Sequence, residues 1–125
     1  LDIDHFKKVN DTYGHSVGDK VLIEFCAVCL KQIRENDIMG RLGGEEFAIA
    51  LVECDIEMAA IVAERIRQAV ASHVVPSGGE EIRFTVSLGV TSMWQGCDLY
   101  SILERADNAM YRAKENGRNQ VQSIE

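Results

Sequence analysis

The feature that most constrains this chain is a pair of adjacent glycines, Gly43 and Gly44, placed between two apolar runs and followed directly by Glu45 and Glu46. Glycine reaches the positive φ angles of tight hairpin turns, so the sequence predicts a β-hairpin over residues 38–52. Two carboxylates directly after a turn concentrate negative charge at the end of a sheet. Such a concentration is useful where a cation binds it.

A second acidic strand end opens the chain. Leu1 to Ile3 is strand-like, and Asp2 and Asp4 lie on either side of Ile3. If this strand lies beside the hairpin, acids from two neighbouring strands come together and form a divalent metal site. Carboxylates gathered without a cation would repel one another, which favours this interpretation for Asp2. For Asp4 a solvated charge at the strand end is the favoured interpretation.

The remaining periodicity predicts a single α+β domain over residues 1–125, with a mainly antiparallel sheet flanked by helices. We expect a helical turn over 6–10, a turn or loop over 76–79, and strands over 82–91 and from Val121. Helices are predicted over 16–34, 55–72 and 98–117, with caps at Ser16, Asp55 and Asp98 and with Leu99 among the inward residues of the last.

The composition of the chain excludes some classes of partner. The net charge of −7 argues against a nucleic-acid polymer as partner, because no basic surplus meets a phosphate backbone. A small phosphorylated ligand is compatible with this net charge. No apolar run reaches membrane-spanning length. Cys26 and Cys29 form a C-x-x-C inside an apolar helical stretch, so we interpret them as reduced residues packed on one helix face rather than as a zinc or redox pair, in a cytoplasmic setting.

Several motifs in order resemble the GGDEF domain of the diguanylate cyclase family. They are Leu1–Lys7 (LDIDHFK), Asn10–Asp19 (NDTYGHSVGD), Arg41–Phe47 (RLGGEEF), Thr85–Gly89 (TVSLG) and Ala106–Lys114 (ADNAMYRAK) with Gly117–Asn119. The third signature position is Glu, which keeps the carboxylate. The resemblance implies a nucleotide-cyclase, polymerase-palm-like fold. The family's segment before the first strand is absent, so we expect an N-terminally incomplete domain with an upstream sensory or dimerisation domain, either free in the cytoplasm or as the cytoplasmic part of a membrane-anchored protein.

The resemblance implies that two GTP molecules are joined into cyclic di-GMP with release of two pyrophosphates, at the interface of a bacterial homodimer. It implies Mg²⁺, with Mn²⁺ as an alternative, held by Asp2, Glu45 and the backbone carbonyl of Ile3, and Glu46 as a ligand of a second ion. A general base must take the proton from the attacking 3′-hydroxyl. Glu45 is the family's candidate for it, and Glu46 and water remain open.

The substrate-binding residues implied by the resemblance fall into two groups. Asn10 and Asp19 would read guanine, because a carboxylate accepts from its N–H donors and an amide both donates and accepts. Leu22 would line the base pocket or belong to the core. The phosphates would be bound by cations and by backbone N–H groups, at Lys7, Lys114, Arg118, His5 and Phe6. A first-turn helix acid at Asp19, and cations that complement a helix dipole at Lys114 and Arg118, are the structural alternatives.

Arg34 and Asp37 match the family's R-x-x-D inhibitory site, where the product binds, with Arg65 as a secondary contact. Product binding there would give allosteric inhibition. An alternative function is a non-catalytic GGDEF module that binds cyclic di-GMP or GTP as a signalling receptor. A polymerase-like palm acting on a nucleic-acid strand is disfavoured by the acidic charge.

Overall fold

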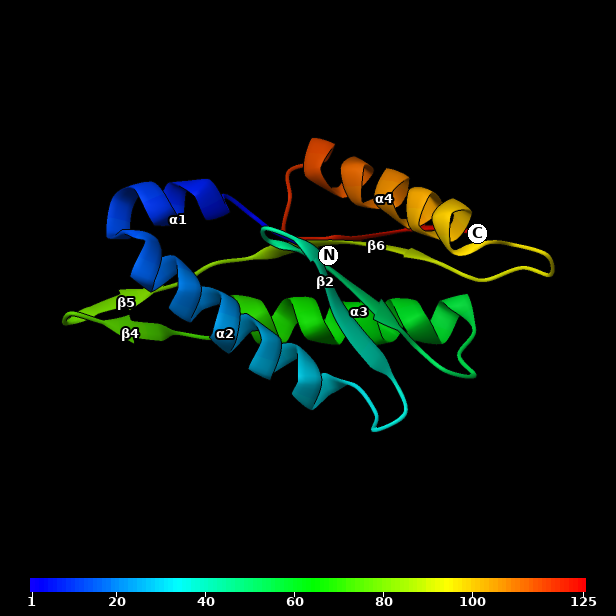
Figure 1. Cartoon of the computed structure of the whole chain (residues 1–125), viewed down its shortest axis with the longest axis horizontal. Coiled ribbons are helices and arrows are strands. Elements are labelled where there is room, and N and C mark those ends of the chain that lie inside the picture. The colour runs from blue at the N-terminus through cyan, green and yellow to red at the C-terminus, as the bar shows by residue number, and fades with distance from the viewer.

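The computed structural model describes residues 1–125 and has a central five-stranded sheet in the order β2-β3-β1-β6-β7 (Figure 1). Its strands are β1 (Asp2–Ile3), β2 (Ile38–Gly43), β3 (Glu46–Ala50), β6 (Val86–Thr91) and β7 (Val121–Ile124). All neighbouring pairs are antiparallel except β6 with β7 at one edge, which is parallel. The predicted α+β class with a mainly antiparallel sheet is confirmed.

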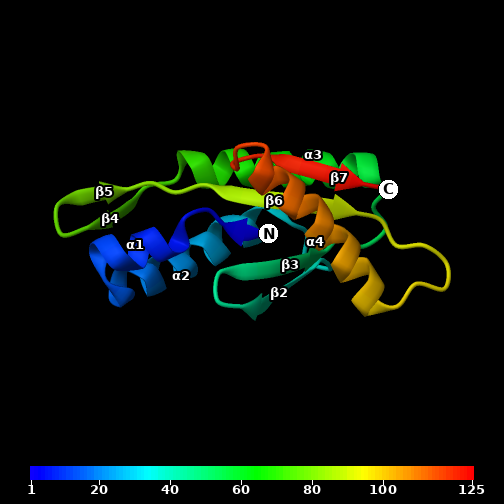
Figure 2. The same cartoon turned by 90° about the horizontal axis from the view of Figure 1, so that it is seen from above.

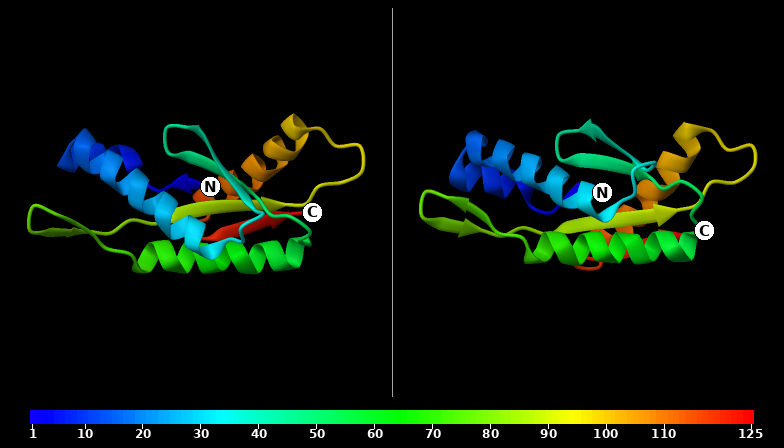
Figure 3. Two further views of the ribbon diagram at one scale, coloured as in Figure 1. Left: turned by 60° about the horizontal axis from the view of Figure 1, so that its bottom comes forward. Right: turned by 90° about the horizontal axis from the view of Figure 1, so that it is seen from below.

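The helices cover both faces of this sheet. They are α1 (Phe6–Tyr13), α2 (His15–Gln32), α3 (Ile56–Ser72) and α4 (Leu99–Glu115). Helices α2 and α3 contact each other on one face, and α4 lies over β6 and β7 on the opposite face (Figures 2 and 3). This arrangement places the C-terminal end of α4 near β1.

The core lies between the sheet and the α2–α3 layer. Three phenylalanines meet at its centre, with ring centroids 5.1 Å apart for Phe25 and Phe47 and 6.3 Å apart for Phe25 and Phe84. Along β6 the side chains alternate, so Val86 enters this core while Gly89 faces α4. A Cβ atom at Gly89 would lie 2.0 Å from the backbone oxygen of Ala106. Glycine therefore allows α4 to approach the sheet closely.

Two of the three predicted helix caps form. The carboxylates of Asp55 and Asp98 accept bonds from the backbone N–H groups three residues later, at 2.8 and 2.7 Å. The predicted cap at Ser16 is wrong, because α2 begins at His15 directly after Gly14, with no side-chain cap bond. Gly14 has a φ of +93°, so the chain turns there from α1 into α2 within one residue.

The predicted turn lies at Gly78 and Gly79, and it closes a second hairpin that was not predicted. Strands β4 (Val75–Ser77) and β5 (Glu80–Ile82) pair across Gly78 and Gly79, both of which have positive φ. This hairpin extends from one end of the molecule and contacts the first half of α2, where Lys20 donates to the Pro76 carbonyl oxygen (Figure 1). The inward placement of Leu99 is also wrong: it is 73% exposed, because α4 comes closest to β6 about two turns farther along, at Ala106 and Met110.

Candidate functional site

The glycine hairpin forms, with its turn one residue later than predicted. The two turn residues between β2 and β3 are Gly44 and Glu45, and Gly44 has a φ of +53°. The register shifts between Arg41 and Gly43, and the Arg41 Nε atom donates to the Gly44 carbonyl oxygen at 2.8 Å. Glu45 is therefore part of the turn itself, and Glu46 is the first residue of β3.

Strand β1 lies directly beside this turn. Asp2 is the antiparallel partner of Glu46, and the backbone N–H of Ile3 donates to the Glu45 carbonyl oxygen at 3.3 Å. Partners in antiparallel strands present their side chains on the same face, so the carboxylates of Asp2 and Glu46 share a face of the sheet. The structure thus brings together the three acids that the sequence singled out for metal binding and catalysis.

The charge of Asp2 is only partly compensated. Its side chain is 9% exposed, and its Oδ2 atom lies 2.9 Å from Lys114 Nζ at the end of α4. Burial raises the pKa of Asp2, the Lys114 ammonium opposes this shift, and the nearby Glu45 charge adds to it. A buried carboxylate whose pKa is raised by burial and by a second acid is typical of a site that receives a cation.

The carboxylates of Asp2 and Glu45 suit a magnesium ion that also binds phosphate oxygens and water, rather than a metal whose ligands all come from the protein. No group of three or more His, Cys, Asp or Glu residues is arranged to hold a metal ion. Magnesium commonly takes one or two carboxylates and completes its shell with phosphate oxygens and water. Asp2 and Glu45 supply that number of carboxylates from adjacent chain segments.

Asp4 differs from the prediction. Instead of a solvated charge it is buried, 4% exposed, and accepts from Thr85 Oγ1 at 2.7 Å, from Ser87 Oγ at 2.6 Å and from the Asn119 backbone N–H at 3.0 Å. It therefore connects β1 to β6 and to the turn after α4. Sequence reasoning missed this role, although the TVSLG motif contains both hydroxyl donors.

The two predicted guanine readers lie close to each other at the α1–α2 junction. A Cβ atom on Gly18 would lie 1.8 Å from Asn10 Oδ1, so the amide of Asn10 rests on α2 next to Asp19, where glycine leaves room for it. Asp19 is exposed. Leu22, one turn later, is 9% exposed and belongs to the core cluster, while it also lines an apolar groove of about 300 Å³ between α2 and β2.

The predicted phosphate cations differ in their surroundings. Lys114 pairs with Asp2, whereas Lys7 and Arg118 are exposed and make no ion pair. Arg118 has a φ of +64°, and its backbone N–H donates to the Ala113 carbonyl oxygen at 2.9 Å, which closes the end of α4. This closure holds Arg118 and Lys114 at the same helix end.

The start of α1 leaves backbone donors open. His5 precedes Phe6, the first residue of the helix, with a left-handed φ of 54° and makes no side-chain capping bond. The first N–H groups of a helix have no partner within it, and they point outward together with the positive end of the helix dipole. Both predicted residues thus lie where backbone N–H groups are available to an anion.

The predicted inhibitory residues are connected by hydrogen bonds at the open end of the β2–β3 hairpin, opposite its turn. The Asp37 carboxylate accepts from the backbone N–H groups of Arg34 at 2.8 Å and Val52 at 3.0 Å and from the Arg34 guanidinium at 3.3 Å. These bonds lower the pKa of Asp37 to about 2, the Val52 N–H contributing most. Arg65 of α3 donates to the Gln32 carbonyl oxygen, so it lies near the same helix end.

Two further predictions concern the whole chain. All four cysteines are free, and Cys29 belongs to the core cluster with Cys26 packed against it, which confirms their packing role. None of the four helices combines the length and the apolar character needed to cross a bilayer.

Comparison with known proteins identifies the family. Residues 1–120 match the family described as "Diguanylate cyclase, GGDEF domain". Diguanylate cyclase A of Treponema denticola is 45% identical over 124 residues, which are 97% of this chain and 33% of that protein. The chain spans about a third of the length of the curated relatives it matches.

Solved structures agree with this assignment. The diguanylate cyclase SiaD of Pseudomonas aeruginosa, in complex with its activator SiaC, has a TM-score of 0.95 at 40% identity, covering 98% of this chain and 47% of that one. The GGDEF domain of DgcB from Caulobacter crescentus, in complex with c-di-GMP, has a TM-score of 0.92 at 37% identity, covering 98% and 73%. The chain described here is a member of the GGDEF-domain family of diguanylate cyclases.

Proposed function

We propose that this chain catalyses the condensation of two GTP molecules into cyclic di-GMP and two pyrophosphates, as half of a homodimer. The observation that carries the proposal is the meeting of Asp2 and Glu45 beside Lys114, from three segments far apart in the sequence. Each 3′-hydroxyl attacks the α-phosphorus of the other GTP, and pyrophosphate leaves. One site holds one GTP, so the reaction needs two protomers facing each other.

The residues of the chain would divide the work as follows. Lys114 and Arg118 at the end of α4, Lys7 on α1 and the first N–H groups of α1 would bind the triphosphate, because each presents a positive group to an anion. Asp2 and Glu45, with the Ile3 carbonyl and with Glu46 for a second ion, would hold magnesium, or manganese in its place. That metal would offset the charge on phosphate oxygens.

Base recognition and proton transfer would use separate residues. The Asn10 amide and the Asp19 carboxylate would pair with guanine, with Leu22 against the base. An adenine would leave Asp19 without a donor, so ATP would be rejected. Glu45 would accept the proton of the 3′-hydroxyl, since it lies in the turn beside the proposed metal ligands.

Product inhibition would act through Arg34 and Asp37, with Arg65 as a further contact. The Arg34 guanidinium bonds Asp37 and the Val52 carbonyl oxygen through Nε and Nη2, and its side chain is 63% exposed, so its Nη1 group would donate to a phosphate or a guanine acceptor. Asp37, with its pKa lowered to about 2, is an ionised acceptor for guanine N–H groups. A ligand that joins two such sites would keep the active sites apart.

The test is turnover by the purified chain with GTP and magnesium, alone and fused to a dimeric coiled coil. We expect cyclic di-GMP from the fused chain, measured by chromatography, and none from its Glu45→Ala variant. Absence of product from an enforced dimer that binds GTP would overturn the proposal.

A receptor without catalysis is the second candidate, favoured by one observation. Arg34, Asp37 and Val52 are already connected by hydrogen bonds in the free chain, so the product site would need no assembly. The same variant discriminates the two, because Glu45→Ala would abolish turnover in an enzyme and would leave cyclic di-GMP binding intact in a receptor.

A further inference from the structure

Asp4 holds three parts of the chain together, and the proposed function gives it no role. It directly follows β1, and its backbone N–H donates to the Thr85 carbonyl oxygen at 2.9 Å. In its carboxylate, Oδ1 accepts from the Ser87 hydroxyl, whereas Oδ2 accepts from the Thr85 hydroxyl and from the backbone N–H of Asn119. The carboxylate therefore joins the end of β1 to the start of β6 and to the turn after α4.

The buried carboxylate of Asp4 depends on these three donors alone. No basic side chain forms an ion pair with it. A buried carboxylate is costly unless it is hydrogen-bonded, and bonds to a charged acceptor are stronger than bonds between neutral groups. The three bonds use both oxygens, so Asp4 has less capacity for a cation than Asp2. Its contacts order the neighbouring segments instead.

The turn after α4 has a backbone conformation that needs such support. Arg118 and Asn119 have φ angles of +64° and +45°. Residues with a side chain rarely adopt this left-handed conformation, and they keep it only where surrounding contacts fix it. Asn119 is fixed from two sides, because its backbone N–H bonds to Asp4 and its Oδ1 atom accepts from Nη1 of Arg67 on α3 at 3.0 Å.

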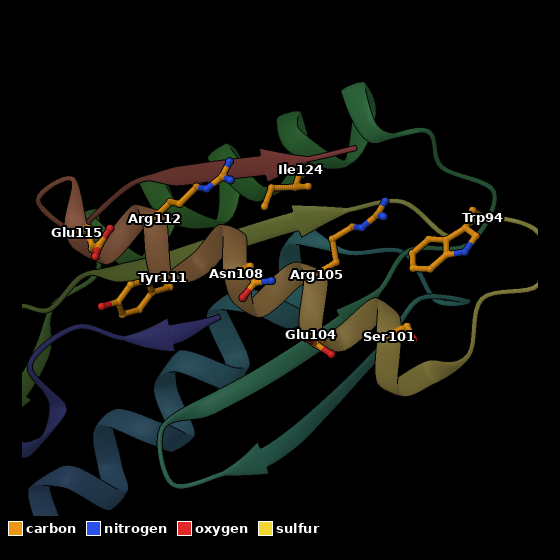
Figure 4. A pocket seen from close by; sticks show the side chains of 9 residues that line it. All are labelled: Trp94, Ser101, Glu104, Arg105, Asn108, Tyr111, Arg112, Glu115 and Ile124. Carbon is orange, nitrogen blue, oxygen red and sulfur yellow. The ribbon is translucent and has the colours of Figure 1, made fainter.

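The same turn lies next to the cations proposed to bind phosphate. Figure 4 shows the end of α4 and the turn that leads from it into β7. Lys114 lies at this end of α4, with its Nζ atom 2.9 Å from Asp2 Oδ2. Arg118 directly precedes Asn119, so the bond from Asn119 to Asp4 keeps Arg118 close to the end of β1.

From these contacts we infer that Asp4 is a positioning residue for the triphosphate of GTP, with Arg67 supporting the same turn. Asp4 contacts neither the phosphates nor the metal. It fixes the turn so that Arg118 and Lys114 meet the triphosphate beside the acid of β1. Holding these cations in place before binding lowers the entropy lost on binding. The inference rests on the proposed function, because that function supplies the triphosphate.

The experiment compares the binding of GTP and of GMP, each with magnesium, by isothermal titration calorimetry. The Kd of GMP divided by that of GTP measures the contribution of the β- and γ-phosphates. Asp4→Ala releases the turn, so this ratio should fall at least about tenfold. The Kd of GMP should change less than about twofold, because the proposed guanine readers Asn10 and Asp19 lie at the separate α1–α2 junction. Partial unfolding would weaken both nucleotides together.

Two substitutions separate positioning from a purely stabilising role. Asp4→Asn keeps the shape of the side chain. Its amide oxygen can accept from Thr85 and from the Asn119 N–H, and its NH₂ group can donate to the Ser87 hydroxyl, so it should keep the ratio within about threefold of wild type. Thr85→Val removes a bond on the β6 side and leaves the bond to the turn. It should lower the melting temperature without changing the ratio.

A variant on α3 reaches the same turn without disturbing the buried carboxylate. Arg67→Met removes the bond to the Asn119 side chain, so the ratio should fall about threefold. Arg112→Met is its matched control for the loss of a cation. Arg112 is exposed and makes no ion pair, and its side chain extends toward Ile124 of β7 (Figure 4). It should leave the ratio unchanged.

Circular dichroism melting shows which variants are folded at the assay temperature. An unchanged ratio in folded Asp4→Ala, or an equal loss for GTP and GMP, would overturn the inference, and Arg67→Met decides in the same way if Asp4→Ala does not fold. A wild type that binds GTP no more tightly than GMP would also overturn it. Cyclic di-GMP synthesis by the enforced dimer is measured separately: its absence, with the expected ratios, would overturn the proposed function and leave the positioning role of Asp4 standing.

Discussion

Asp2 and Asp37 are both carboxylates at the start of a strand with a basic side chain beside them, yet the fold treats them in opposite ways. Asp37 receives two backbone N–H bonds and the Arg34 guanidinium, and its pKa falls to about 2. Asp2 is buried beside Glu45 with Lys114 as its ion-pair partner, and its pKa rises. The first carboxylate is satisfied by the protein, whereas the second keeps capacity for a cation. The opposite pKa shifts of the two carboxylates therefore follow from burial and from the number of donors that the protein supplies to each.

The largest expected effect is on turnover. Asp2→Asn keeps the size of the side chain and removes its charge, so we expect cyclic di-GMP synthesis to fall by at least about 100-fold, the scale seen when a charge-stabilising group is removed from an active site. The free energy of unfolding, measured in urea, should not fall, because the buried charge disappears. Glu81→Gln on β5 is the matched control for loss of a carboxylate. Full activity of Asp2→Asn would contradict the role of Asp2 in the reaction.

The ion pair of Asp2 with Lys114 gives the second test. Lys114→Met leaves Asp2 buried beside Glu45 without its cation, and we expect a loss of about 2 kcal/mol in stability, since an unpartnered buried charge is costly and this one is partly accessible. Adding Asp2→Asn to Lys114→Met should recover most of that loss but not turnover. If Asp2→Asn changes the free energy of unfolding by the same amount with and without Lys114, the ion pair is not coupled and the comparison fails at Asp2.

At the open end of the hairpin, Asp37→Asn should weaken inhibition by cyclic di-GMP at least about tenfold. The initial rate of synthesis, measured before product accumulates, should be nearly unchanged. The substitution also weakens the bond from the Val52 N–H, so the thermal midpoint should fall by a few degrees. Product-inhibition curves and thermal melts measure both effects. An equal loss of turnover in Asp37→Asn and Asp2→Asn would contradict the division into a product site and a reaction site.

The sequence predicted most of what local chemistry determines. The caps at Asp55 and Asp98 depend on residues three positions away, and the hairpin depends on glycines within it, so both could be read from the chain. The juxtaposition of β1 with that hairpin was inferred from the acids at the two strand ends and from the ordered motifs of a known family. Periodicity alone gives no partner for a strand of two residues.

The errors arose where distant residues or very short elements decide the outcome. Asp4 is buried because Thr85 and Ser87, more than eighty positions away, bond to it. Strands β4 and β5 have three residues each, too few to show alternation, so the turn at Gly78 and Gly79 was predicted without the hairpin that it closes. The Val52 N–H that holds Asp37 comes from beyond the hairpin, a contact that no local pattern reveals.

The smallest expected effect, and the most direct comparison of the two carboxylates, is their opposite pH dependence. The ordinary pKa of both is 3.8, and Asp37 titrates at about 2 in the fold, so the stability it contributes is present above about pH 4 and is lost as pH falls toward 2. Asp2 has a raised pKa, so its ionisation reduces stability as pH rises above 3.8 through its folded pKa.

Urea unfolding in the presence of a chelator, between about pH 3 and pH 7, separates the two contributions. The stability of wild type relative to Asp37→Asn should increase with pH, and its stability relative to Asp2→Asn should decrease. Glu81→Gln is the matched control, because Glu81 makes no ion pair or side-chain hydrogen bond in the structure. Slopes of the same sign for Asp2 and Asp37 would mean that the protein stabilises both carboxylates in the same way. The electrostatic argument for a cation beside Asp2 would then fail.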